Sequence, residues 1–513
     1  MTTQSENTRR IAKNTLFLYV RMLFSMLVSL YTSRVVLNTL GVEDYGIYNV
    51  VGGFVAMFSL ISSSLSSSTS RFLTFELGRG DKDRLEKVFS TSLLIHASLA
   101  VIVFVLAESV GLWFLNTQMT IPPARLYAAN WVFQASILSF MFGLFSVPYN
   151  ASITSHEKMS AFAYIGILDV VLRLAIVLFI AHSAWSFDRL IVYAVLLVCV
   201  SIFLQLVYLT YCRKHFEECR LSFSFDRKCW KEMSGFAGWN FIGCSAALLK
   251  DQGVNILLNL FIGPVLNAAR GIATSVNTAV SAFAGNFMTA LNPQITKSYA
   301  CGDYKYMMSL AERGSRFSFY ILLILALLIL LETDFILTLW LKHYPAHTVS
   351  FVRLILILTL LDILSNTLVT MQNATGKIRN YQLAVGCMLM MNFPLSYVCL
   401  SLGFAPESTL VVAIFVSICC LILRLLFLRK MVNLSVSCFL RNVCLNVLYV
   451  SALSAIIPVC FRLQCPEGWT RFVTVVALSV ICAILAVLFL GCDTHERHFV
   501  KERLVAVRQR LLK

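Results

Sequence analysis

Hydrophobic residues in this chain occur in long runs that are separated by short polar and charged stretches. A helix that crosses a bilayer needs about 20 mostly apolar residues, and fourteen stretches of the chain meet that need. The predicted spans are 14–37, 46–67, 88–115, 125–148, 161–182, 189–211, 238–262, 265–291, 316–340, 348–370, 380–402, 408–428, 441–461 and 470–491. Little of the chain remains for a soluble domain, so the pattern predicts an all-α integral membrane protein with about 14 transmembrane helices.

The composition supports this prediction. Of the 513 residues, 58% are hydrophobic and 13% are charged, whereas a soluble domain carries about 25% charged residues. So much apolar side chain needs the bilayer as its solvent.

The positions of the basic residues indicate the orientation in the membrane. With both termini in the cytoplasm, the inner loops hold most of the 42 Lys and Arg residues, for example Arg213 and Lys214. Outer loops instead carry acids such as Glu43 and Asp44. Because cytoplasmic loops of membrane proteins are enriched in Lys and Arg, the net charge of +16 reports this orientation. Binding to nucleic acid is not needed to explain it.

The first six spans and the next six resemble two copies of one unit. Leu37-Asn38 matches Leu258-Asn259, and Gly80-Asp81 matches Gly302-Asp303 at nearly the same spacing. Six spans per copy is an even number, so the copies share an orientation and are related by a pseudo-two-fold along the membrane normal. Parallel repeats of this kind place a substrate site between the halves.

This organisation divides the chain into five predicted parts. They are an N-terminal six-helix bundle (1–213), a cytoplasmic interfacial linker (214–237), a C-terminal six-helix bundle (238–430), transmembrane helices 13 and 14 (431–492), and a basic amphipathic cytoplasmic tail (493–513). Asp493 and Glu496 have the spacing of a capping box at the start of the tail.

The eighth span carries a polar stripe along its whole length. At 100° per residue its polar residues fall within one arc, which includes Asn267, Thr274, Asn277 and Ser281. Lipid cannot satisfy such groups, so they face either a water-filled cavity or a neighbouring helix. Because the stripe also contains Arg270, we favour a cavity that these residues line.

Several basic residues lie within the spans, where each costs about 2.5–3.5 kcal/mol at the bilayer centre. Asp169 and Arg173 can neutralise each other at i and i+4, and Arg353 and Arg424 lie near span ends. The basic residues without an obvious partner in the sequence are Arg21, Arg34, Lys250 and Arg270. We interpret them as a cationic, substrate-binding cavity for an anionic group; the alternative is structural pairing with acids that the sequence does not place.

Two carboxyl groups within spans, Asp362 and Glu108, have no nearby base and could couple transport to an ion gradient. A buried hydrogen-bonded carboxyl is the commoner alternative. The chain lacks the nucleotide-binding and zinc-protease motifs, and its eight His form no ligand cluster. We therefore expect no enzymatic activity, no catalytic residue, no metal site and no cofactor.

Two motif runs resemble Wzx-type polysaccharide flippases (O-antigen or capsule repeat-unit flippases) of the multidrug/oligosaccharidyl-lipid/polysaccharide (MOP) exporter superfamily. The first run is Arg34 to Tyr48, followed by Arg71-Phe72 and Gly78. The second comprises Gly238-Trp239-Asn240, Asp251 to Asn255, Phe261 to Pro264, Asn267 to Ala273, and Asn292 to Tyr299. The similarity as a whole spans roughly residues 10–430.

This resemblance implies two six-helix bundles around a central cationic cavity, with Arg21, Arg34, Lys250 and Arg270 holding pyrophosphate or acidic sugars. The implied cargo is an undecaprenyl-pyrophosphate-linked oligosaccharide. It would be moved by alternating access to the outer leaflet of the bacterial inner membrane, for lipopolysaccharide O-antigen or a similar surface polysaccharide. Candidate partners are membrane lipids, a polysaccharide polymerase and a chain-length regulator. A multidrug or cation antiporter of the same superfamily is the alternative.

Overall fold

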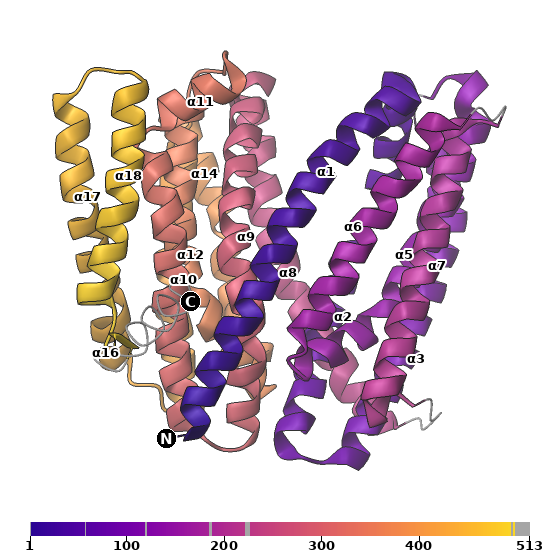
Figure 1. The fold of residues 1–513 in the computed structure, drawn as a ribbon, viewed down its shortest axis with the longest axis horizontal. Helices are drawn as coiled ribbons and strands as arrows, with labels where there is room; N and C mark the ends of the chain where they lie inside the picture. The colour runs from indigo at the N-terminus through magenta and orange to yellow at the C-terminus, as the bar shows by residue number, and fades with distance from the viewer. Residues whose placement is uncertain are drawn as a thin grey trace, which may run out of the picture. The chain divides into compact units, whose positions relative to one another are not determined.

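The computed structural model describes residues 2–56, 58–117, 119, 121–183, 187–220, 226–493, 496 and 497. In this part of the chain all regular secondary structure is helical (Figure 1). Eleven of the described helices are long and apolar enough to cross a membrane. The all-α membrane fold that the hydrophobic pattern predicts is confirmed.

The three remaining predicted spans are not among these eleven. Span 46–67 covers the end of α1 (Thr2–Ala56) and the start of α2 (Ser59–Arg79). Spans 238–262 and 265–291 correspond to α8 (Arg227–Phe261) and α9 (Pro264–Ala300). The polar residues of α8 and α9, including Lys250 and Arg270, lower the hydropathy of helices that are long enough to cross the bilayer. Eleven apolar helices and these three agree with the expected number.

The chain divides into two compact units. The N-terminal unit comprises Met1–Ser245 and Thr289–Asp303, and the C-terminal unit comprises Ala246–Met288 and Tyr304–Lys513. Helices α8 and α9 therefore each contribute residues to both units. The finer division into five parts with boundaries at 213, 237, 430 and 492 stays a prediction.

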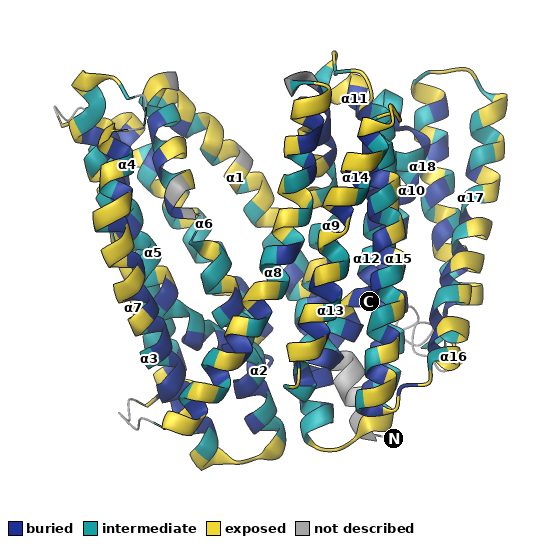
Figure 2. Cartoon of the chain, turned by 180° about the vertical axis from the view of Figure 1, so that it is seen from behind, coloured by how far each residue is buried: buried dark blue, intermediate teal, exposed yellow. Residues whose placement is uncertain are grey.

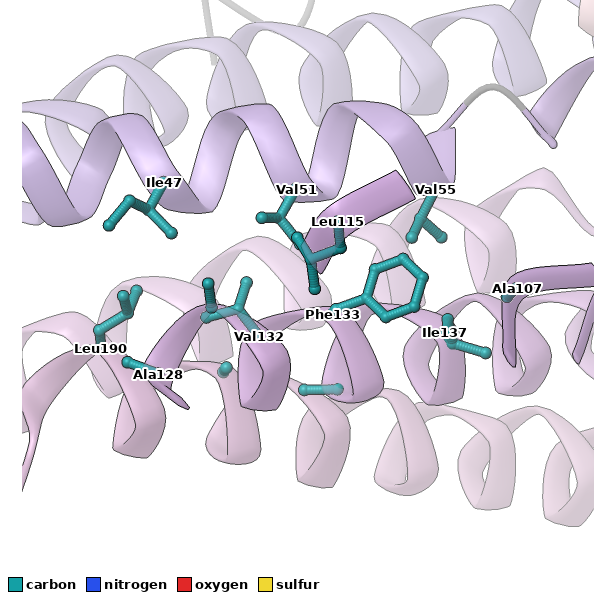
Figure 3. Close-up of a cluster of buried hydrophobic side chains, with 13 residues drawn as sticks. Ile47, Val51, Val55, Ala107, Leu115, Ala128, Val132, Phe133, Ile137 and Leu190 are labelled. Atoms are coloured by element: carbon teal, nitrogen blue, oxygen red, sulfur yellow. The ribbon is translucent and has the colours of Figure 1, made fainter. Parts of the chain in front are cut away.

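The N-terminal unit is a bundle of long helices. After α1 and α2 it contains α3 (Lys82–Leu106), a π-helical turn (Ala107–Gly111), α4 (Leu112–Thr117), a 3₁₀ turn (Pro123–Arg125), α5 (Leu126–Ser155), α6 (Met159–His182), α7 (Arg189–His215) and a second 3₁₀ turn (Glu217–Cys219). One of its apolar clusters joins the end of α1 to α5. Val51 and Val55 lie against Val132 and Phe133, and all four side chains are buried (Figure 3).

The C-terminal unit is also a bundle of helices joined by short connections. It contains α10 (Tyr304–Leu331), α11 (Thr333–Leu341), α12 (Thr348–Thr375), α13 (Arg379–Met390), α14 (Asn392–Ser401), α15 (Ser408–Val432), α16 (Val436–Phe439), a π-helical turn (Leu440–Leu445), α17 (Asn446–Gln464), α18 (Trp469–Ala486) and a last π-helical turn (Val487–Gly491). The hairpin of α17 and α18 corresponds to predicted transmembrane helices 13 and 14 (Figure 1).

A buried ion pair attaches this hairpin to the rest of the unit. Arg471 of α18 donates to Glu332, which lies between α10 and α11, at 2.9 Å, and both side chains are at least 92% buried. Large apolar residues of α17 such as Leu448 and Ile457 are exposed. Figure 2 shows the exposed positions along this helix in yellow. Such a surface would be unfavourable in water and is suited to lipid.

The turns of the two predicted copies share an unusual backbone conformation. Gly80 and Gly302, which match in the sequence, have φ of 74° and 75° and follow the ends of α2 and α9. Gly41 and Gly263 are separated by the same 222 residues and also have positive φ, 83° and 117°. Glycine adopts this conformation without steric cost. The repeat inferred from short sequence matches thus extends to the backbone of its turns.

The predicted capping box is formed in part. The backbone N–H of Asp493 donates to the Glu496 carboxylate at 2.8 Å, and the carboxylates of both residues also bind Arg316 of α10. The predicted amphipathic tail beyond Arg497 lies outside the described residues.

Candidate functional site

Arg21, the first predicted cavity residue, packs against α6. Its guanidinium carbon lies 4.3 Å from the centroid of the Phe162 ring, a cation–π contact. A Cβ atom at Gly166 would lie 2.8 Å from the Arg21 side chain, so the glycine makes room for the arginine. Among the described residues no carboxylate lies within ion-pair distance of Arg21. The positive charge is therefore placed against an aromatic ring and is not neutralised.

Arg34 lies on the same helix and is exposed, also without an ion-pair partner in the described part of the chain. The non-helical residue within α1 is Gly41, which follows both arginines. At 100° per residue, Arg21 and Arg34 therefore point about 140° apart. That Arg21 and Arg34 line one cavity stays a prediction. Helix α1 is not bent between them, and a bend there would be needed to turn both side chains to the same side.

Lys250 and Arg270 converge on one carboxylate in the C-terminal unit. The Asp251 Oδ1 atom is 3.8 Å from Lys250 Nζ and 4.0 Å from an Arg270 guanidinium nitrogen. Arg270 is only 9% exposed, and its other terminal nitrogen is buried without a hydrogen-bond partner. Two cations thus share one acid, which gives the group a net positive charge. Structural pairing, the alternative to a substrate-binding role, requires acids near these cations, and Asp251 is one such acid. A single carboxylate cannot neutralise both Lys250 and Arg270.

The residues of the polar stripe of α9 differ in their contacts. Asn277 accepts a hydrogen bond from Thr359 of α12 at 2.7 Å and another from Ser281 at 3.2 Å, so this part packs against a neighbouring helix. Thr274 donates to the Arg270 carbonyl within α9. The side-chain oxygen of Asn267, in contrast, is buried without a partner. Helix packing explains Asn277, and the predicted cavity-lining role is untested for all four residues.

The remaining basic residues in spans have partners in the structure, but only the partner of Arg173 was predicted. Arg173 donates to Asp169 at 2.7 Å, as the i, i+4 spacing predicts. Arg353 pairs with Asp334 at 2.9 Å, and Arg424 donates to the Tyr381 hydroxyl at 3.1 Å.

The two proposed ion-coupling carboxyls differ in their surroundings. Asp362 accepts a hydrogen bond from the Ser417 hydroxyl. Glu108 lies in the π-helical turn Ala107–Gly111, and one of its carboxyl oxygens is buried without a partner. Single π-helical turns often occur at functional sites. Glu108 is therefore the better candidate of the two for a coupling role, which stays a prediction.

A cavity of about 590 Å³ lies inside the N-terminal unit. Five helices line it: α1, α2, α5, α6 and α7. The lining residues are Tyr48, Gly52, Val55, Ser62, Ala135, Ser136, Ser139, Phe140, Gly143, Leu144, Arg173, Ala194, Leu197 and Ser201. This cavity was not predicted from the sequence, in which Arg173 is half of a neutral pair with Asp169. The spacing of Ser136, Ser139 and Gly143 on one face of α5 is the signal that could have indicated it.

A second cluster that was not predicted from the sequence surrounds Glu157, in the turn between α5 and α6. Its carboxylate is 1% exposed and lies 2.8 Å from Arg10 of α1 and 2.7 Å from Lys297 of α9. Gln294 of α9 also donates to it, and Asn14 of α1 donates to its backbone carbonyl. Glu157 has a φ of 59°, which is uncommon for a residue with a side chain. One carboxylate thus joins three segments that are distant in the sequence.

Comparison with known proteins agrees with this architecture. The family model described as polysaccharide biosynthesis protein matches residues 11–299. The uncharacterized membrane protein EpsK of Bacillus subtilis is 22% identical over 329 residues, which are 62% of this chain and 63% of that protein.

Solved structures similar to this chain include MATE transporters. A crystal structure of MATE in the bent conformation superposes with a TM-score of 0.73 at 14% identity, covering 83% of this chain and 96% of the other. An outward-facing MATE family transporter of the MOP superfamily gives 0.70 at 14% identity with the same coverage. At such identities these similarities establish the fold.

Proposed function

Because the chain belongs to the polysaccharide biosynthesis protein family and has the fold of MATE transporters, we propose that it is a lipid-linked oligosaccharide flippase. The cargo is an undecaprenyl-pyrophosphate-linked repeat unit, which the protein moves from the inner to the outer leaflet of a bacterial cytoplasmic membrane. Both termini lie in the cytoplasm. A polysaccharide polymerase and a chain-length regulator would use the exported units.

The observation that carries this proposal is an excess of positive charge in the spanning helices. Arg21 has no carboxylate partner in the described chain, and Lys250 and Arg270 share Asp251. A charge at membrane depth is costly and is retained where it has a function. An anionic pyrophosphate would supply the missing negative charge, since guanidinium groups bind phosphate oxygens through two parallel hydrogen bonds.

In this proposal the cations bind the anionic head group on the cytoplasmic side and release it on the outer side. The repeated halves, whose turns share the glycine conformation at Gly80 and Gly302, suit alternating access by the motion of one half against the other. No bond in the cargo is broken, so the chain needs to bind, shield and release the head group.

The test is a deletion strain fed with a radiolabelled sugar precursor. Lipid-linked repeat units should accumulate on the inner leaflet, and the wild-type gene should restore export. Arg270→Ala should reduce export by about tenfold or more, the effect of losing one charge-assisted hydrogen bond to the cargo. Arg270→Lys should retain part of the activity because the charge remains.

Arg353→Ala is the matched control, because Arg353 is also an arginine in a span but is paired with Asp334. All variants must be inserted at wild-type levels. Normal export by Arg270→Ala would contradict the proposed role of the cations, and a strain without accumulated lipid-linked units would contradict the flippase itself.

A cation antiporter is the second candidate, and Glu108 is the observation that favours it. A buried carboxyl oxygen without a partner in the N-terminal unit is a possible cation or proton site. This alternative predicts that the purified protein in liposomes expels ethidium in exchange for protons and that Glu108→Gln abolishes the exchange. The flippase predicts no such exchange.

A further inference from the structure

The cavity inside the N-terminal unit has unused hydrogen-bonding groups. The hydroxyls of Ser62, Ser136 and Ser139 line it, and none of the three bonds to another described residue. Ser201, also in the lining, differs because its hydroxyl donates to the Leu197 carbonyl. Three hydroxyls from α2 and α5 can therefore donate to and accept from a polar ligand.

The charged group in the lining is Arg173, whose Nε donates to Asp169. Its two terminal nitrogens make no hydrogen bond with the described residues, so they can donate to a ligand oxygen. The pair as a whole is neutral. A cationic drug would need an unpaired carboxylate, and the lining contains none.

The apolar part of the lining includes two aromatic rings, Tyr48 and Phe140. Tyr48 is held in place by Tyr193, whose ring stands edge-on to it at a centroid distance of 5.2 Å. A sugar ring has an apolar C–H face and a polar rim of hydroxyls. Its face can pack on an aromatic side chain while its hydroxyls bond to serine and arginine. The volume of about 590 Å³ lies within the range of about 300–1,000 Å³ that is typical of ligand pockets.

We propose that this cavity is a docking pocket for a sugar residue of the cargo. It binds the sugar through the free serine hydroxyls and Arg173, with the ring against Tyr48 or Phe140. The pocket would thus select the saccharide, whereas the cations named above hold the pyrophosphate. This inference rests on the proposed flippase function.

The first test fills the pocket. A Cβ atom at Gly143 would meet no atom within 4 Å, so Gly143→Leu adds volume to the cavity without a backbone clash at that atom. We expect export in the complementation assay to fall by about tenfold or more, as for the loss of two hydrogen bonds. Leu138→Phe, on the exposed side of the same helix, is the control and should export normally. Normal export by an inserted, stable Gly143→Leu variant would overturn the proposal.

The second test identifies what occupies the pocket. The photoreactive residue p-benzoylphenylalanine replaces Ser136, or Leu138 as the control, in cells that hold lipid-linked repeat units with a tritiated sugar. After irradiation, mild acid cleaves the bond between sugar and pyrophosphate. Tritium that stays on the protein at position 136, and not at 138, supports a sugar in the pocket.

The other results overturn the proposal. Tritium released by the acid would show that the lipid part occupies the cavity, and absence of cross-linking at position 136 would show that the cargo does not enter it. If the deletion strain accumulates no lipid-linked units, the flippase function fails first. If it accumulates them and the filled variant still exports, only the pocket assignment fails.

Discussion

Each half of the chain has an ion pair between helices at its predicted outer end. The two pairs lie at corresponding positions but differ in chemistry. In the N-terminal unit, Arg125 before α5 pairs with Asp188 before α7 and also with Asp44 of α1. In the C-terminal unit, His347 before α12 lies 2.6 Å from Glu407 before α15. His347 is 222 residues beyond Arg125, the spacing of the glycine turns. The position of the contact is shared, whereas its charge is permanent in one half and depends on protonation in the other.

The turns at the predicted inner ends also share a backbone conformation, but they differ in residue type. Glu157 follows α5 and Gly376 follows α12, and both have positive φ, 59° and 75°. A residue with a Cβ atom adopts this conformation at a cost of roughly 1–2 kcal/mol, and glycine does so freely. The N-terminal unit offsets that strain with the contacts of Glu157 to Arg10, Lys297 and Gln294. In the N-terminal unit this turn therefore makes a long-range contact at the cost of backbone strain.

The largest expected effect comes from replacing Glu157 with glycine, the residue type at the corresponding turn of the C-terminal unit. Glu157→Gly relieves the strained backbone but leaves Lys297 beside no carboxylate, and removing one partner of a buried ion pair costs about 3–5 kcal/mol. We expect a net loss of about 2–4 kcal/mol. Equilibrium unfolding of the purified protein in detergent micelles measures it.

Glu157→Gln is the matched control, because it keeps the side-chain length and the strain and removes only the charge. It should be destabilised too. A Glu157→Gly variant as stable as the wild type would show that the cluster does not hold the three segments together.

The next effect concerns the N-terminal outer pair. Arg125→Leu leaves Asp44 and Asp188 close together without a cation, and we expect a loss of about 1–2 kcal/mol, since the three side chains are partly exposed. Burial works to raise the pKa of Asp188, but the hydrogen bond and charge of Arg125 outweigh it and hold that pKa below its ordinary value.

The stabilisation from this pair is therefore present above the ordinary aspartate pKa of about 4 and is lost as the pH falls through the lower folded-state value. Thermal unfolding of the wild type and Arg125→Leu, measured between pH 3 and pH 7, should show stability curves that converge in acid. Curves that stay parallel would contradict the role assigned to Arg125.

The smallest effect concerns the C-terminal outer pair, which is an ion pair only while the imidazole is protonated. The side chain of His347 is 42% exposed, so the contribution is within about 1 kcal/mol. His347→Ala should therefore lower the free energy of unfolding by less than Arg125→Leu does, as equilibrium unfolding in detergent micelles measures. A larger loss for His347→Ala would contradict this order.

The sequence alone determined the helices, the predicted orientation and the family resemblance of this protein. Apolar runs set by bilayer thickness and the repeated Gly80-Asp81 and Gly302-Asp303 turns are local features, so they can be read along the chain. The i, i+4 pairing of Asp169 and Arg173 was predictable for the same reason.

Only the tertiary structure decided which distant side chains meet. That Arg173 lines a cavity, that Lys250 and Arg270 share Asp251, and that Glu157 binds Lys297 depend on how helices pack. Helical periodicity gives the direction of a side chain around its own axis, but not the neighbouring helix that it faces. The partner of each charge is set by contacts between residues far apart in the chain, and those contacts determine which charges remain free for a cargo.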